Sequence, residues 1–280
     1  AAVVGRALTG TGVVSLGLPD LAGFFAAWSF FLMLRVFDEH KDFELDLSNH
    51  PERVLQRGLI TRKHLKVAAS LAIIIQLGAS LSFDGGTGPV TCWWLLVIGW
   101  SGLMAKEFFC GAWLERRLLL YAVSHMVVMP MALLWMAQIG AGSAALPPAI
   151  GLLAAMSFCS GAAFEVTRKC RGPEEERPTV DSYSKVLGRR GAVATIVVLL
   201  GLGAGLEWLL LTVLIGTPTA VWGAAVIGSL IPALISLARF SSAPSLQGRE
   251  RNEGAVSLAM LAGYVVVLVA VAVTRGLAWV

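Results

Sequence analysis

The sequence predicts an all-α, polytopic membrane protein of about nine transmembrane helices, and its composition and charge distribution lead to this fold class. Hydrophobic residues make up 56% of the 280 residues and charged residues only 14%, about half the share found in soluble globular proteins. The windows 85–105, 118–164 and 254–274 contain no charged residue, and 191–238 contains only Glu207. Each window holds one or two of the lengths of about 20 apolar residues that cross a bilayer. The composition therefore argues against a soluble enzyme, a secreted disulfide-rich protein and a nucleic-acid-binding protein.

Gly, Pro and charge clusters divide the chain into nine apolar segments. We expect these segments at 2–17, 20–37, 64–83, 89–107, 117–138, 146–166, 188–210, 217–239 and 255–276. The first is short and no signal peptide precedes it, so we expect the N-terminus to have been trimmed. We predict a single domain over 1–280. The two longest polar loops follow the second and sixth segments, which indicates an internal duplication with a second half starting near 117.

The basic residues are concentrated in alternate loops. The loops after the third, fifth and seventh segments contain no Lys or Arg. All 22 basic residues except Arg275 lie at one face, counting Arg6 in the first segment. The positive-inside rule makes this face cytoplasmic, with the N-terminus inside and the C-terminus outside. We therefore expect a protein of the cell inner membrane whose net charge of +4 requires no nucleic-acid partner.

An acidic motif directly continues the second apolar segment. Asp38, Asp42 and Asp46 stand four residues apart, which places them along one face of a helix, and Glu39 lies beside them. Carboxylates so close repel each other unless a cation intervenes. Mg²⁺ prefers oxygen ligands and commonly combines one or two carboxylates with substrate phosphates. A solvated loop in which basic neighbours such as Arg53 pair with the acids is the alternative, but the four-residue register at a membrane edge favours a phosphate-ester site.

This stretch, LRVFDEHKDFELDLSNHPERVLQRGLIT, resembles the first aspartate-rich motif, NDxxDxxxD, of the UbiA superfamily of intramembrane prenyltransferases. Asp38 takes the Asn position, Glu39 the first Asp, and Asp42 and Asp46 the other two. HPERVLQRGLIT resembles the basic segment that follows, with Arg53 at its Arg. The two substitutions in the acidic motif keep oxygen ligands. The resemblance covers essentially the whole chain and implies a UbiA-like helical bundle with polar cytoplasmic loops.

The loop FEVTRKCRGPEEERPTVDSYSKVLG occupies the position of the family's second aspartate-rich motif and departs from it. Glu165 falls at the first aspartate and Glu175 is the best placed for the last, but Arg168 and Lys169 stand where an acid is expected. Two readings stay open for a site here. The loop forms a divergent second metal site, or Arg168, Lys169 and Lys185 neutralise a diphosphate directly. A hinge loop with solvated charges is the third alternative.

Three further residues have both a structural and a functional interpretation. Arg35, one turn before the acidic motif, and Lys106, at a position similar to a family lysine, either bind a diphosphate or snorkel to the membrane interface. His125 is isolated in an uncharged window, where a hydrogen-bonded packing histidine is more common than a contact for an acceptor.

The resemblance implies Mg²⁺-dependent (or Mn²⁺-dependent) transfer of a prenyl group from a polyprenyl diphosphate to an aromatic or lipidic acceptor. A terpene cyclase, which ionises the same donor without an acceptor, is the near alternative. A divalent-cation transporter is more distant, because the acids concentrate at one face. The predicted site comprises the catalytic residues Asp38, Asp42 and Asp46, the diphosphate-binding residues Arg35, Arg53, Lys106, Arg168, Lys169 and Lys185, and the metal ligands Asp38, Glu39, Asp42, Asp46, Glu165 and Glu175.

Overall fold

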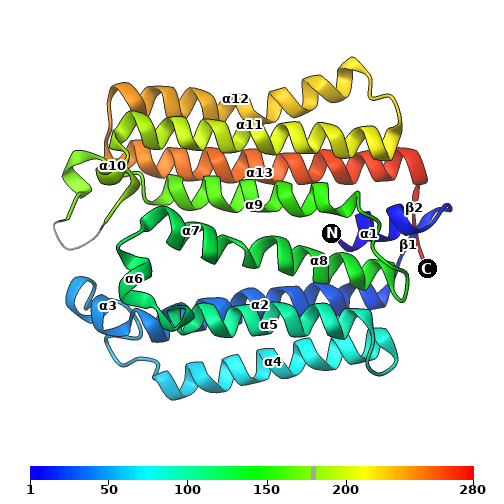
Figure 1. The fold of residues 1–280 in the computed structure, drawn as a ribbon, viewed down its shortest axis with the longest axis horizontal. Coiled ribbons are helices and arrows are strands. Elements are labelled where there is room, and N and C mark those ends of the chain that lie inside the picture. Colours follow the sequence, from blue (N-terminus) through cyan, green and yellow to red (C-terminus); the bar gives the residue numbers. More distant parts are fainter. Residues whose placement is uncertain (178–180) are drawn as a thin grey trace.

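Long helices lying side by side form the protein in the computed structural model, which describes residues 1–177 and 181–280 (Figure 1). The elements are α1 (Ala2–Thr9), β1 (Val14–Leu16), α2 (Leu18–Lys41), α3 (Phe43–Asn49), α4 (Arg62–Asp84), α5 (Pro89–Ala105), α6 (Gly111–Glu115), α7 (Leu118–Met126), α8 (Val128–Ala141), α9 (Ile150–Arg168), α10 (Tyr183–Val186), α11 (Gly188–Ile215), α12 (Ala220–Ser242), α13 (Leu246–Arg275) and β2 (Leu277–Trp279), with 3₁₀ turns at Glu107–Phe109 and Pro173–Glu175. Pro178, Thr179 and Val180 of the second predicted motif lie outside the described residues.

The helices confirm the predicted all-α polytopic membrane fold. Within the described residues, seven helical segments are long and apolar enough to cross a membrane, and α5 adds a shorter apolar helix of 17 residues. The predicted segment 117–138 consists of α7 and α8. Its break at Val127 coincides with Pro130, which has no N–H to donate to the carbonyl of Met126. The predicted segment 2–17 is instead the eight-residue α1 followed by β1, because glycines at 10 and 12 favour irregular backbone there.

Two groups of helices each surround an apolar core. In the first group, which includes α2, α4, α5 and α8, Phe30, Trp94 and Trp135 are buried together. The indole nitrogen of Trp135 donates to Ser80 Oγ at 3.1 Å, so this polar atom has a partner inside the bundle. In the second group, which includes α9, α11, α12 and α13, the core contains the fully buried Leu237. Figure 1 shows α8 and α9 lying where the two groups meet.

The short helix α1 packs tightly against α8 through two glycines. A Cβ atom at Gly5 would collide with the backbone carbonyl of Ala137, and one at Gly140 would collide with the carbonyl of Ala2. Small residues at a helix contact let two backbones approach closely, which is a common way to pack helices in a bilayer. This contact fixes α1 against the bundle.

Arg6 lies at the end of the bundle opposite the acidic motif, so the prediction that it belongs to the basic face is wrong. Its guanidinium lies 3.1 Å from Asp20 in the first turn of α2, whereas Asp38 is in the last turn of the same helix. Arg275 lies at the same far end and donates to the backbone carbonyls of Thr11 and Ala7. Two of the 22 basic residues therefore lie away from the polar loops.

The polar end of the bundle is where the chain brings distant segments together. α2 and α9 end there, α13 begins there, and α3 and α10 lie across this end (Figure 1). Side chains from both halves of the chain therefore meet at one face.

Candidate functional site

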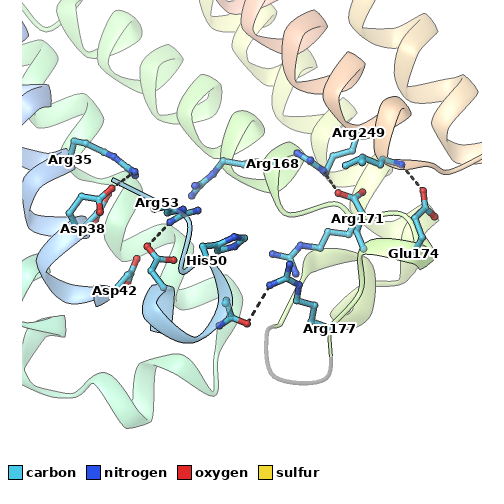
Figure 2. Close-up of a pocket in the computed structure, with 15 residues that line it drawn as sticks. Arg35, Asp38, Asp42, His50, Arg53, Arg168, Arg171, Glu174, Arg177 and Arg249 are labelled. Carbon is cyan, nitrogen blue, oxygen red and sulfur yellow. Dashed lines mark hydrogen bonds and ion pairs between the residues drawn. The ribbon is translucent and has the colours of Figure 1, made fainter. Parts of the chain in front are cut away.

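A cavity of about 620 Å³ opens at the polar end of the bundle, and charged side chains dominate its lining. Figure 2 shows Asp38 and Asp42 on one side of it, opposite Arg168, Arg171 and Arg249. The full lining is Arg35, Asp38, Glu39, Asp42, Asp46, Asn49, His50, Arg53, Arg168, Arg171, Glu174, Glu175, Arg177, Leu246 and Arg249. Both polar loops that the sequence singled out contribute to this one cavity.

The three aspartates of the first motif stay in helical register across the junction of α2 and α3. The backbone N–H of Asp42 donates to the carbonyl of Asp38 at 2.8 Å, and that of Asp46 donates to the carbonyl of Asp42 at 2.8 Å. Asp42 itself joins the two helices, with φ −88° and ψ 5°. The four-residue spacing therefore places all three side chains along the same wall of the cavity.

The acids of this wall differ in whether a cation already neutralises them. Glu39 is paired with Arg35, and Asp46 is paired with Arg53. Among the described residues, the carboxylates of Asp38 and Asp42 have no hydrogen bond or ion pair. These two acids are therefore the ones available to a ligand in the cavity.

In the second loop, Glu165 does not line the cavity and is already neutralised. Its two carboxylate oxygens lie 2.7 Å from Arg168 Nη2 and 2.7 Å from Lys169 Nζ. Only 9% of Glu165 is exposed, so the two cations offset the cost of burying its charge. Arg168 also reaches the cavity wall, whereas Lys169 does not.

The glutamate triplet after α9 fixes the loop to the start of α13. Glu174 accepts the backbone N–H of Leu246 at 2.6 Å, and Glu175 Oε1 lies 2.6 Å from Arg249 Nε. Glu176 accepts the hydroxyl groups of Ser182 and Ser184 at 2.7 Å. Glu175, the predicted metal ligand of this loop, thus lines the cavity with its charge already paired.

Two arginines that the sequence did not single out add positive charge to the cavity. The guanidinium of Arg171 has no acidic partner among the described residues, and Arg177 donates only to the neutral amide oxygen of Asn49, at 3.3 Å. Figure 2 shows these two guanidinium groups close together at the cavity. Like charges so close are unfavourable by themselves and are stabilised by an anion between them. The signal that could have found them is the run RKCRGPEEER, in which bases flank the acids.

Besides Lys169, two more predicted diphosphate ligands lie outside the cavity. Lys106 is an exposed residue after α5, and Lys185 donates to the backbone carbonyl of Arg177. Arg249, in contrast, lines the cavity although it was not predicted as a site residue. It lies before residue 255, where the last predicted apolar segment begins. A sequence cannot show which cations of a loop face inward, because the loop backbone decides it.

The acidic side chains do not form a metal cage by themselves. In residues 1–177 and 181–280, no group of three or more His, Cys, Asp or Glu residues could hold a metal ion. Asp38 and Asp42 nevertheless fit Mg²⁺, which often takes only one or two carboxylates and completes its shell with phosphate oxygens and water. The donor set therefore suits a metal that arrives together with a phosphorylated ligand.

The chain is similar to known proteins both in sequence family and in fold. The model of the UbiA prenyltransferase family matches residues 1–247. A solved structure, described as "Structural and mechanistic insights into the biosynthesis of Digeranylgeranylglyceryl phosphate synthase in membranes", is similar with a TM-score of 0.62 and 16% sequence identity. That similarity covers 98% of this chain and 91% of the other, and at this identity it shows the fold alone. No curated protein matches the sequence.

Proposed function

Because this chain is an integral membrane protein that belongs to the UbiA prenyltransferase family, we propose that it transfers a prenyl group from a polyprenyl diphosphate to an aromatic or lipidic acceptor. The observation that carries the proposal is the charged cavity, in which the unpaired Asp38 and Asp42 face arginines of the second loop (Figure 2). Such a cavity suits a dense anion bound together with a divalent cation. The solved UbiA-type structure is named for the synthesis of a diprenylated glyceryl phosphate, which supports a lipidic acceptor as one class to test.

The arginines bind the diphosphate and stabilise it as a leaving group. When the allylic C–O bond breaks, negative charge builds on the diphosphate, and Arg168 and Arg171 lie at the cavity wall where they can stabilise that charge. Arg53 is held against Asp46, so its guanidinium is already oriented when the ligand arrives. Planar guanidinium groups suit this task because they bind phosphate oxygens in pairs.

Asp38 and Asp42 would hold Mg²⁺ at the cavity. A bound ion would supply positive charge that favours departure of the diphosphate. Glu39 and Asp46 fix the arginines that flank these two acids. The apolar chain of the donor would lie in the helical bundle, which keeps water from the allylic cation.

The test compares Asp42→Asn with Glu44→Gln in purified protein. Glu44 is exposed on α3 and does not line the cavity, so its substitution controls for a changed charge on the same helix. With Mg²⁺ and prenyl diphosphates of C10 to C25, we expect Asp42→Asn to lower product formation at least about 100-fold, as for loss of a group that stabilises transition-state charge. Glu44→Gln should retain wild-type rates.

The same assay tests the metal and the class of acceptor. Chelation of divalent cations with EDTA should abolish turnover, and added Mg²⁺ should restore it. Mass spectrometry with a phenolic acid, or with a prenylated glyceryl phosphate, identifies the acceptor, whereas a hydrocarbon or alcohol formed from the donor alone identifies a terpene cyclase. Wild-type turnover by Asp42→Asn, at an equal level of folded protein, contradicts the proposed site.

A further inference from the structure

A second polar cluster lies directly behind the first aspartate of the acidic motif. Lys41 Nζ lies 2.8 Å from Glu107 Oε1 and donates to Tyr121 Oη at 2.8 Å. Tyr121 Oη in turn donates to the same oxygen of Glu107 at 3.0 Å. The other oxygen, Oε2, is buried and has no hydrogen-bond partner among the described residues. Glu107 is thus fixed through one oxygen and leaves the other available.

His125 presents a free ring nitrogen to that oxygen. Its Nδ1 lies 2.9 Å from the backbone carbonyl of Tyr121, which can only accept, so Nδ1 carries the hydrogen and Nε2 keeps a lone pair in the neutral ring. Nε2 lies 3.4 Å from Glu107 Oε2 and has no hydrogen-bond partner in the described chain. Only 12% of the His125 side chain is exposed. The ring stacks on that of Tyr121 with centroids 4.0 Å apart, which fixes its plane.

The backbone around Glu107 is strained to hold this arrangement. Glu107, Phe108 and Phe109 have φ values of 47°, 51° and 57°, three consecutive side chains in the left-handed region. Each such residue costs on the order of 1 kcal/mol or more. The ring of Phe108 packs edge-on against Trp100 and His125, at 5.2 and 5.8 Å between centroids. Strain maintained by packing is common at functional sites, and here it keeps Glu107 beside His125.

His125 and the first aspartate of the acidic wall line one small cavity. A separate small cavity of about 10 Å³ is lined by Asp38, Lys41, Ser101 and His125 together with apolar side chains. Its volume suits about one oxygen atom. Asp38 lines both this cavity and the larger one, so a group held at His125 lies next to the predicted diphosphate site. Glu165, the acid of the second loop, is not available as a base because both of its oxygens are paired.

We propose, on the premise that the protein transfers prenyl groups as described above, that His125 is the base for a hydroxyl-bearing acceptor and that Glu107 is its positioning residue. The allylic C1–O bond breaks and its electron pair leaves with the diphosphate. A lone pair of the acceptor hydroxyl forms the new bond to C1, and the O–H electron pair stays on the acceptor oxygen. The proton moves to His125 Nε2, where the Glu107 carboxylate stabilises the imidazolium. The other charges near His125 are those of Lys41 and Lys169.

The experiment separates cleavage of the donor from transfer of the prenyl group. Purified His125→Ala is assayed with C1-labelled geranylgeranyl diphosphate, Mg²⁺ and the acceptor that gives most product with the wild type. Loss of a general base should lower transfer by about 100-fold or more. Diphosphate release should continue, with the prenyl group recovered as the alcohol formed with water. Added imidazole should restore transfer in His125→Ala, which a purely structural role does not predict.

Two further variants complete the test. Glu107→Gln should lower kcat for transfer at least about tenfold without changing KM for the acceptor, because it acts through His125. His64→Gln changes an exposed histidine at the start of α4 and should leave transfer unchanged. Unchanged transfer in His125→Ala overturns the inference. So does a wild-type product in which the prenyl group is bonded to a carbon atom of the acceptor, or one that forms without an acceptor. Each of these results leaves the proposed cleavage of the donor intact. Failure of the wild type to cleave any prenyl diphosphate overturns the proposed function itself.

Discussion

The unpaired carboxylates of Asp38 and Asp42 explain how one acidic motif can contain two kinds of residue. Two charges one helical turn apart repel, and a cation between them removes that repulsion. Arg35 already neutralises the charge of Glu39, and Arg53 neutralises that of Asp46. The motif therefore divides into a pair that is available to a ligand and a pair that fixes the arginines.

Cys170, just after α9, gives a residue-scale test of burial at the same end of the bundle. Only 1% of this residue is exposed, and burial raises the pKa of its thiol from 9.0 to about 11. Between these values the unfolded chain has lost the thiol proton and the folded chain has kept it, so the free energy of unfolding falls as pH rises from about 9 to about 11. The loss should be on the order of 2 kcal/mol, and it should be absent from Cys170→Ala.

The measurement is the melting temperature in detergent at pH 8, 9, 10 and 11 for both proteins. Only the difference between them is informative, because other groups titrate in this range and burial also raises the pKa of Tyr183. Maleimide at neutral pH provides an independent readout, since it should modify the exposed Cys110 and not Cys170. Equal pH dependence of the two proteins contradicts the burial argument.

The sequence predicted one side of the site well and the other side only in part. The first motif lies on a continuous helical register, so a spacing of four residues suffices to predict that Asp38, Asp42 and Asp46 share a wall. The second loop has no such register. The contact of Glu175 with Arg249 depends on a pairing across 74 positions, which no local pattern reveals.

At the scale of elements, hydrophobic length predicted the seven membrane-length helical segments of the described residues and the shorter apolar helix α5, because a helix needs about 20 apolar residues to cross a bilayer. Hydrophobic length did not predict where α1 ends or where α7 breaks from α8. These boundaries depend on single residues, namely the glycines at 10 and 12 and Pro130, which has no N–H. The strained turn at Glu107–Phe109 was equally invisible, because its left-handed residues are not glycines. Packing by Phe108, rather than local preference, holds that turn.

The contact between α1 and α8 provides the element-scale prediction. Gly140→Ala places a methyl group against the carbonyl of Ala2, so the helices must separate, and we expect a loss of about 1–3 kcal/mol of stability. Gly78→Ala is the matched control in α4, where an added Cβ meets no atom within 4 Å. It should be neutral or stabilise by up to about 1 kcal/mol. Thermal unfolding in one detergent compares the two, and equal melting temperatures contradict the proposed close contact.

At the scale of the whole molecule, the two ends of the bundle differ in the use of charge. The far end contains Arg6 and Arg275, which are bound to Asp20 and to backbone carbonyls. The polar end holds the cavity, where arginines and acids remain partly unpaired. An excess of Lys and Arg marks the cytoplasmic side of a membrane protein, so the cavity should open to the cytoplasm.

Labelling with a membrane-impermeant maleimide tests this orientation. Cys110 is exposed in the turn between α5 and α6 at the polar end, and Thr87 is exposed between α4 and α5 at the far end. Two variants each keep one cysteine, either Cys110 or the new cysteine of Thr87→Cys, and have alanine in place of all the others. In intact cells the maleimide should modify the cysteine of Thr87→Cys. The maleimide should modify Cys110 only after the membrane is permeabilised. The opposite pattern would place the cavity outside, where a diphosphate made in the cytoplasm could not reach it because the charged group does not cross the bilayer.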